Sequence, residues 1–171
     1  MAPDSSAPVA HGRAPKHPKS CHERALGLLA VRPRSRRELE RRLLQARFDL
    51  DEVRDVLARL EGVGLVDDGA FARQYAEHRF RSRREGRRAV ADGLRAAGIS
   101  PELTEATVGE APDDEEERAL SLARSRVPRL AGLEPARAFT RLSSLLTRRG
   151  YAPELARRSA RIALELSAGE D

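Results

Sequence analysis

The chain has 171 residues, of which 40% are hydrophobic and 35% are charged, a balance typical of a globular protein. It contains no apolar run near the roughly 18 residues that a membrane-spanning helix needs, and no apolar signal segment in its first twenty residues. The single cysteine, Cys21, excludes an internal disulfide and a cysteine-based zinc site, and it fits a reducing, cytoplasmic compartment.

The charge is basic, with a net value of +5 and a pI near 10.2. Such an excess suits a polyanionic partner such as nucleic acid. Arginine supplies 30 of the 32 basic side chains. Its planar fork matches phosphate, but a general amino-acid bias of the source organism would produce the same count, and both explanations stay open.

The N-terminal residues 1–20 hold four of the ten prolines and show no hydrophobic periodicity. This composition predicts a disordered tail. A mitochondrial or plastid targeting peptide is a weaker interpretation, because the amphipathic arginine pattern is missing.

Helical spacing of apolar residues begins at Cys21 and continues almost without a break. Val53, Val56 and Leu57 follow the i, i+3, i+4 rule, and Phe71 and Tyr75 repeat the four-residue step. No segment alternates apolar and polar residues over the length of a strand. The sequence therefore predicts an all-α protein.

An internal repeat divides this helical region. The segments 94–103 and 146–155 share Leu, Gly, Pro, Glu and Leu at an offset of 52 residues. The pattern predicts a helix that ends at a glycine, an apolar residue packed beneath the turn, and Pro-Glu at the start of the next helix. Residues 43–53 form a looser copy, in which Arg47 stands at the glycine position.

The copies imply three units of three short helices each, arranged as an elongated and curved array. Asp67 or Asp68 can cap the helix that opens the second unit, and acidic residues 113–117 suit the start of the helix that opens the third. The predicted organisation is a tail at 1–20 and units at 21–66, 67–111 and 112–171, the last with a short C-terminal tail.

A search for catalytic or metal-binding groups finds no convincing site. Cys21 and His22 are adjacent, so on a helix they point about 100° apart and cannot form a nucleophile–base pair. The segment 62–64, Gly-Val-Gly, follows a helix and is typical of a helix end. The eight carboxylates of 102–117 match no calcium loop. We expect no enzyme, no bound metal and no cofactor.

Three basic clusters are the positive finding. Residues 32–47 hold seven arginines and two glutamates, residues 79–88 hold six and one, and residues 134–161 hold seven and two. In the first cluster, Glu38 and Arg42 can pair at i, i+4. The second cluster has too few acids to neutralise itself, which favours an anionic partner. The candidate surface is Arg34, Arg37, Arg41, Arg79, Arg81, Arg83, Arg84, Arg87, Arg88, Arg148 and Arg149.

The aromatic residues argue against a base-stacking platform. Phe48, Phe71, Tyr75 and Phe139 occupy core positions of predicted helices. Phe80 lies among arginines and could be exposed, although burial in the core is the preferred interpretation. We therefore expect the arginines, rather than stacked rings, to meet nucleic acid.

Two ordered signatures stand in the first two units. Residues 32–39 read Arg-Pro-Arg-Ser-Arg-Arg-Glu-Leu, and a second series runs from Leu60 through Gly64-Leu65-Val66-Asp67-Asp68, Phe71-Ala72 and Tyr75 to Arg79, Gly86, Leu94 and Gly98-Ile99. Taken together, these residues resemble the RecX family, regulators of the RecA recombinase, whose pattern R-x-R-S-x-x-E-L is similar to the first signature. The resemblance covers 25–100, residues 112–169 match only as a third repeat, and 1–20 have no counterpart.

Two positions depart from the family pattern. Arg47 replaces the glycine that usually precedes the aromatic residue of the first repeat, so that helix is expected to end differently. Gly93 stands where the family commonly has glutamate, which should weaken its helix by up to ~1 kcal/mol.

The resemblance implies three tandem helical units that bind in the groove of the RecA–single-stranded DNA filament. In the family, this binding blocks filament extension and suppresses ATP hydrolysis, strand exchange and the coprotease activity of the filament, with roles in DNA repair, recombination and the SOS response. We expect a monomer whose arginines face phosphate, with weaker binding to duplex DNA.

Two other classes stay open from the sequence. An independent helix-turn-helix DNA-binding protein, such as a small transcription factor, fits the helix lengths, but it would commonly dimerise and read a major groove with one defined helix. A helical scaffold for an acidic protein would have little affinity for nucleic acid.

Overall fold

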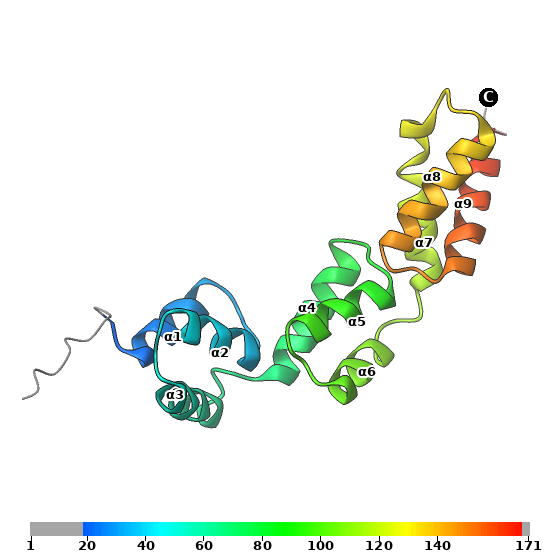
Figure 1. Cartoon of the computed structure of the whole chain (residues 1–171). Coiled ribbons are helices and arrows are strands. Elements are labelled where there is room, and N and C mark those ends of the chain that lie inside the picture. Colours follow the sequence, from blue (N-terminus) through cyan, green and yellow to red (C-terminus); the bar gives the residue numbers. More distant parts are fainter. Residues whose placement is uncertain (1–18, 169–171) are drawn as a thin grey trace, which may run out of the picture.

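The structure is a computed structural model that describes residues 19–168, so most of the predicted N-terminal tail lies outside it. Every regular element in the described range is a helix, which confirms the all-α prediction. Figure 1 shows three helical groups placed one after another in an elongated, bent array. Unit 1 comprises α1 (Cys21–Val31), α2 (Arg36–Gln45) and α3 (Leu50–Gly62); unit 2 comprises α4 (Asp68–Arg81), α5 (Arg87–Ala96) and α6 (Pro101–Gly109); unit 3 comprises α7 (Glu115–Arg124), the short 3₁₀ helix η1 (Val127–Leu130), α8 (Pro135–Arg148) and α9 (Pro153–Ala168).

Side-chain caps begin several of these helices. The Ser20 hydroxyl accepts a hydrogen bond from the Glu23 amide at 3.2 Å, and the Glu23 carboxylate accepts one from the Ser20 amide at 2.8 Å, which completes a capping box. Asp67, rather than Asp68, caps α4, because its carboxylate accepts the Ala70 amide at 2.9 Å. Such a cap stabilises a helix by about 1 kcal/mol.

The repeated glycine turn has the predicted geometry in units 2 and 3. Gly98 and Gly150 adopt φ values of 86° and 87°, which L-residues with side chains rarely take. The amide of the next residue, Ile99 or Tyr151, donates to a carbonyl of the preceding helix at 3.1 or 3.2 Å. Both following side chains are buried, so the turn closes the helix and seals the core beneath it.

The corresponding turn of unit 1 shows that the expected difference at Arg47 is wrong. Arg47 adopts a φ of 72°, and the amide of Phe48 donates to the carbonyl of Leu43 at 3.3 Å, as in the other two copies. The helix therefore ends in the same way with a side chain present. This left-handed backbone costs an L-residue about 1–2 kcal/mol relative to the right-handed conformation.

Each unit has a hydrophobic core of its own, built from helical positions spaced three and four apart. Leu39, Leu43 and Leu57 are fully buried in unit 1, whereas Phe71 and Phe80 lie in the core of unit 2. Phe80 is thus packed rather than exposed, as preferred from its spacing. The unit 3 core is lined by Leu142, Leu146, Tyr151 and several alanines of α7 and α9.

Polar contacts at the start of α2 join unit 1 to unit 2. The Ser35 hydroxyl caps α2 by accepting the Glu38 amide, and it donates to the Ala97 carbonyl at 2.5 Å. The first amide of α2, on Arg36, donates to the carboxylate of Asp68 at 2.8 Å. The start of α2 therefore docks on the turn that ends α5.

The start of α5 docks on the turn that ends α8 in the same manner. The amide of Gly86 donates to the Arg149 carbonyl at 2.8 Å, and that of Arg88 donates to the Gly150 carbonyl at 3.2 Å. The first amide of α5, on Arg87, donates to the carboxylate of Glu115 at 2.8 Å. Glu115 thus has the role here that Asp68 has at the start of α2. One type of joint thus connects all three units.

Candidate nucleic-acid interface

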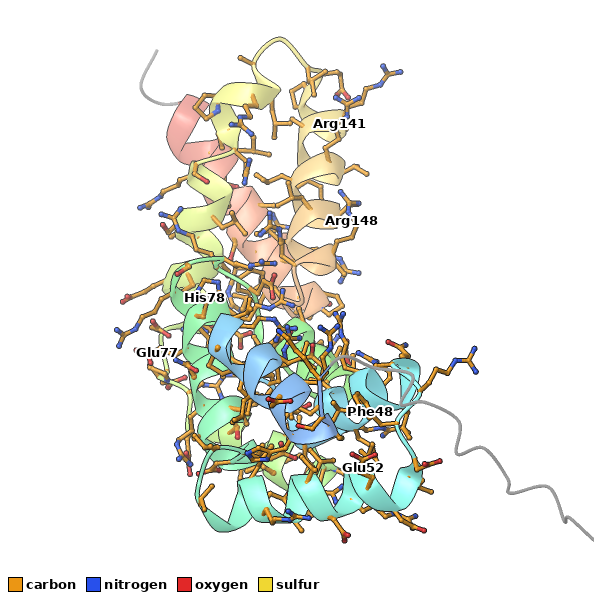
Figure 2. The ribbon with its side chains drawn as sticks, turned by 90° about the vertical axis from the view of Figure 1, so that its left-hand side faces the viewer. Phe48, Glu52, Glu77, His78, Arg141 and Arg148 are labelled. Atoms are coloured by element: carbon orange, nitrogen blue, oxygen red, sulfur yellow. The ribbon has the colours of Figure 1, made fainter. Side chains whose placement is uncertain are left out.

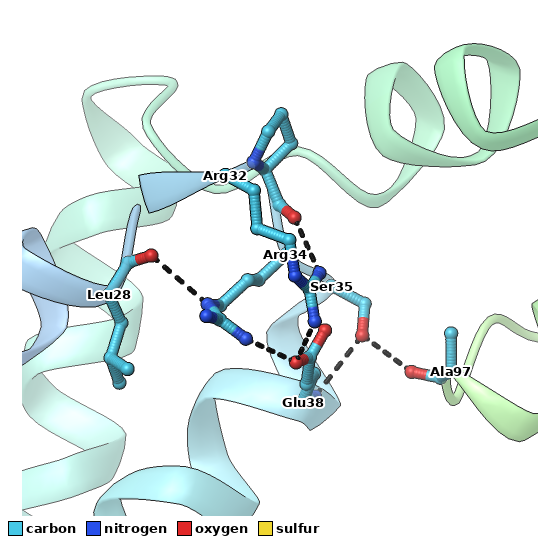
Figure 3. Close-up of polar contacts among 7 residues, drawn as sticks. Leu28, Arg32, Arg34, Ser35, Glu38 and Ala97 are labelled. Carbon is cyan, nitrogen blue, oxygen red and sulfur yellow. Dashed lines mark hydrogen bonds and ion pairs between the residues drawn. The ribbon is translucent and has the colours of Figure 1, made fainter. Parts of the chain in front are cut away.

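Arg34 lies inside unit 1 rather than on the predicted surface. It is only 8% exposed, its Nε donates to the Leu28 carbonyl at 3.0 Å, and its guanidinium pairs with Glu38 (Figure 3). Arg32 also binds Glu38, at 2.5 Å. The predicted Glu38–Arg42 pair is not among the ion pairs of the described residues, because Glu38 is committed to this buried cluster.

The two arginines determine the charge state of Glu38. Burial alone would raise the pKa of this carboxyl, but the hydrogen bonds and charges of Arg32 and Arg34 outweigh burial and lower the pKa. Glu38 therefore stays ionised and anchors the segment between α1 and α2. That segment presents Ser35 and Arg36 to the joint with unit 2.

Arg79 and Arg87 are also held by internal partners. The Nη1 of Arg79 lies 2.7 and 2.8 Å from the two carboxylate oxygens of Glu85, and its Nη2 donates to the Tyr75 hydroxyl at 2.6 Å. The Nε of Arg87 lies 3.6 Å from Glu115, and its Nη2 donates to the Ala111 carbonyl at 3.3 Å. These two side chains stabilise the loop after α4 and the joint with unit 3.

Tyr75 also explains the glycine at position 93. A Cβ on Gly93 would lie 2.1 Å from the Tyr75 hydroxyl oxygen, far inside contact distance. The hydroxyl in turn receives the hydrogen bond of Arg79. Glycine at position 93 thus leaves room for the end of the Tyr75 side chain where α4 approaches α5, a reason that the sequence pattern does not show.

The remaining predicted arginines lie on α2, the end of α4 and the loop after it, α5 and the end of α8. All of them except Arg148 line two hollows or a recess that adjoins the first. The first, which we call the Arg95 hollow, has a volume of about 750 Å³ and lies between α2 and the end of α5. Arg37 and Arg41 line it together with Arg95, which the sequence analysis did not select. Arg88 and Arg95 line an adjoining hollow of about 460 Å³ on the other side of Arg95.

The second, which we call the Arg126 hollow, has a volume of about 570 Å³ and lies where units 2 and 3 meet. Five arginines from three separate segments line it: Arg81, Arg83, Arg84, Arg126 and Arg149. Arg126 comes two residues after the end of α7, and it lies outside the three basic clusters of the sequence. Its position becomes visible only when α7 is packed beside the loop after α4.

Arg148 does not line either named hollow. It projects from α8 on the same side as Arg141, seven residues earlier, as Figure 2 shows. Both side chains are exposed. The predicted candidates are therefore divided among three internal residues, two hollows with an adjoining recess, and the outer face of α8.

The single cysteine of the chain is not prepared to act as a nucleophile. Cys21 is buried, and burial, with a smaller effect from the charge of Glu52, raises the pKa of its thiol to about 11. At neutral pH the thiol is protonated and a poor nucleophile. Within residues 19–168, no group of three or more His, Cys, Asp or Glu side chains is placed to hold a metal ion. No helix of this range is long and apolar enough to cross a membrane.

Comparison with known proteins identifies the family. Residues 21–60 match the model of the first three-helix domain of RecX, and residues 67–108 match that of the second. The regulatory protein RecX of Streptomyces coelicolor is 36% identical over 169 residues, covering 98% of this chain and 89% of that relative. The chain belongs to the RecX family. A Mycobacterium avium RecX is 34% identical over 154 residues and covers 89% of each protein.

Two solved RecX structures share the fold. The crystal structure of RecX from Lactobacillus salivarius superposes with a TM-score of 0.71 at 18% identity, covering 84% of this chain and 94% of that one. A second crystal structure of a regulatory protein RecX gives a TM-score of 0.70 at 22% identity, covering 79% and 67%. The second of these structures and the Streptomyces relative are named regulatory proteins, and the fold that the two structures share with this chain is the helical repeat array described above.

Proposed function

We propose that this chain regulates RecA recombinase by binding the RecA–single-stranded DNA filament and inhibiting its extension, ATP hydrolysis, strand exchange and coprotease activity. The observation that carries the proposal is the gathering of arginines from α2, α5, the end of α4 and the segments that follow α4, α7 and α8 along one elongated array. Membership of the RecX family supports RecA as the partner.

The mechanism is competition for filament surface. An array whose units are joined by hydrogen bonds, through side chains between units 1 and 2 and through the backbone between units 2 and 3, presents its arginines at fixed spacing, so little conformational freedom is lost on binding. Arginines that face phosphate place the rest of the array where the next recombinase protomer or incoming DNA would bind. Such an inhibitor needs no catalytic group, acts in the compartment of the recombinase, and works as a monomer.

The geometry supports an independent helix-turn-helix DNA-binding protein less well. In such proteins the last helix of the unit reads base edges with its N-terminal residues. Here the first turn of α3 carries Asp51 and Glu52, and that of α6 carries Glu102. Carboxylates at these positions repel the DNA backbone, so units 1 and 2 lack a basic recognition helix.

The test is single-stranded-DNA-dependent ATP hydrolysis by RecA, measured while this protein is titrated well below one copy per recombinase monomer. We expect strong inhibition at these low ratios, because blocking extension at few sites affects many protomers. A DNA-binding protein of equal net charge controls for loss of free DNA. If inhibition appears only when enough protein is present to cover the DNA, or not at all, the proposal is refuted.

A further inference from the structure

We propose that the Arg126 hollow binds phosphate groups of the single-stranded DNA backbone, and that it is the principal phosphate-binding site of the array. The inference deepens the proposed function, since it rests on that function for the identity of the nucleic acid. It assigns the DNA contact to Arg83, Arg84, Arg126 and Arg149, at the meeting of units 2 and 3.

The charge of the Arg126 hollow is not balanced from within. Its lining holds five arginines and a single carboxylate, Glu85. Both oxygens of Glu85 are bound by Arg79, which lies outside the lining. The ends of α4, α7 and α8 also reach the hollow, and each contributes a partial charge of roughly −0.5. Even with Glu85 counted in full, these groups supply about −2.5 against five positive charges.

Arg126 adds an observation that points directly to a missing partner. Its Nε is buried and has no hydrogen-bond partner in the described part of the chain. A buried donor on a charged group is costly when it is left without an acceptor, and native structures rarely leave one so. An anion in the hollow, which Arg126 lines, would give its guanidinium an acceptor, and a phosphate oxygen matches the planar donor arrangement of arginine.

The backbone that carries the other arginines is fixed before any ligand arrives. The Arg84 carbonyl accepts the Tyr151 hydroxyl at 2.8 Å, and the Arg83 carbonyl accepts the Arg149 guanidinium at 3.0 Å. Arg84 itself adopts a φ of 48°, a left-handed conformation that these contacts hold in place. Strain that persists in a rigidly held loop is typical of binding sites, where it orients side chains in advance.

The Arg95 hollow differs in ways that suit a protein surface. Its lining includes Glu38 and Glu40 beside three arginines, together with Leu44, which is 38% exposed. Mixed charge and an exposed leucine favour contact with a protein more than with a uniform polyanion. Of the two hollows, the Arg126 hollow is therefore the better match for the phosphate groups of a polyanion.

The experiment measures the affinity of the full-length protein for a fluorescent oligothymidine over a series of salt concentrations. In the hollow variant, Arg83→Gln and Arg126→Gln are combined, so that two phosphate contacts are lost while the loop backbone is kept. The slope of a plot of log affinity against log salt concentration should become shallower by about 1.4, because each of the two lost phosphate contacts contributes about 0.7 on a single strand. Affinity at low salt should fall roughly tenfold or more, because hydrogen bonds between charged groups are lost.

The matched control combines Arg54→Gln and Arg59→Gln on α3, which lowers the net charge by the same amount away from the hollow. Thermal unfolding of all three proteins shows that they fold. Equal slopes and equal affinities for the two double variants would overturn the inference, since only total charge would then matter. A hollow variant that loses stability but retains wild-type affinity would also overturn it, because Arg126 would then be purely structural.

The recombinase assay separates this inference from the proposed function. If the wild-type protein inhibits RecA and the hollow variant binds DNA as tightly as the control, the proposed function survives and the phosphate site fails. If the hollow variant loses DNA binding while the wild-type protein has no effect on RecA, the phosphate site stands and the recombinase partner is refuted.

Discussion

Substitution of Gly150 by alanine should separate unit 3 from unit 2. A Cβ at this position would lie 2.3 Å from the backbone nitrogen of Ala89 and 2.4 Å from its Cβ, so the start of α5 must move away. The joint then loses its backbone hydrogen bonds from Gly86 and Arg88 and the bond from the Tyr151 hydroxyl. Three such bonds contribute about 3 kcal/mol together, at about 1 kcal/mol each.

The backbone conformation adds to this cost. Gly150 has a φ of 87°, and alanine in a left-handed conformation loses about 1 kcal/mol more than glycine. The smaller entropy of the unfolded alanine variant offsets about half of that. The free energy of unfolding should therefore fall by about 3–4 kcal/mol, which urea denaturation followed by circular dichroism can measure.

Gly27→Ala is the matched control. Gly27 lies in α1 with open space around its added Cβ, so alanine should stabilise this helix by about 0.5–1 kcal/mol. Amide hydrogen exchange at Arg88, which donates across the joint, should accelerate in the Gly150 variant alone. Unchanged exchange and unchanged stability in Gly150→Ala would show that the joint is not close-packed and would refute the reasoning.

Three further predictions follow from contacts within unit 1. Arg47→Gly should raise the free energy of unfolding by up to about 1 kcal/mol, because it relieves a φ of 72°; a decrease in urea midpoint would contradict this. Glu38→Gln should lower the free energy of unfolding by about 3 kcal/mol, since Arg34 is left buried without its charged partner. A thermal melt measures this loss, and Glu40→Gln is the control variant that should leave the melting temperature unchanged. The Cys21 thiol should resist a disulfide reagent at pH 8 until the protein unfolds. Because its pKa of about 11 exceeds the ordinary value of 9.0, the unfolded state loses the proton first, and stability should fall between pH 9 and 11 by about 1.4 kcal/mol per pH unit; Cys21→Ala should remove that slope.

The helical architecture could be predicted because it depends on local rules. The spacing of Val53, Val56 and Leu57 places them on one buried face of their helix. Gly98 and Gly150 end their helices because the turn requires a left-handed backbone, which glycine adopts readily. Arg47 shows the limit of such rules. The contacts of Phe48 and the core beneath it impose the same turn on a residue that disfavours it, and local preference is overridden.

The functional surface could be predicted only in part, because charge counted along the chain does not show what each side chain meets. Arg34 and Arg79 belong to basic runs, yet each finds a carboxylate within six residues and turns inward. Arg126 lies outside the three basic clusters of the sequence and becomes part of a hollow through packing against residues more than forty positions earlier. Which arginines stay exposed depends on contacts between units, and these contacts join residues far apart in the sequence.

The joint between units has a direction, since the start of one helix always meets the end of the corresponding helix in the next unit. A directional contact that repeats is open-ended, and between separate molecules it builds fibres. Here the two ends of the array, the turn after α2 and the start of α8, lack the features that would continue this contact. The turn of unit 1 carries Arg47, whose Cβ occupies the space that Gly98 and Gly150 leave for an incoming helix. In unit 3, α8 has 14 residues against 10 in α5 and begins at Pro135, which has no amide to donate. These two features disfavour the same contact between separate molecules, and the left-handed arginine at position 47 is one of them.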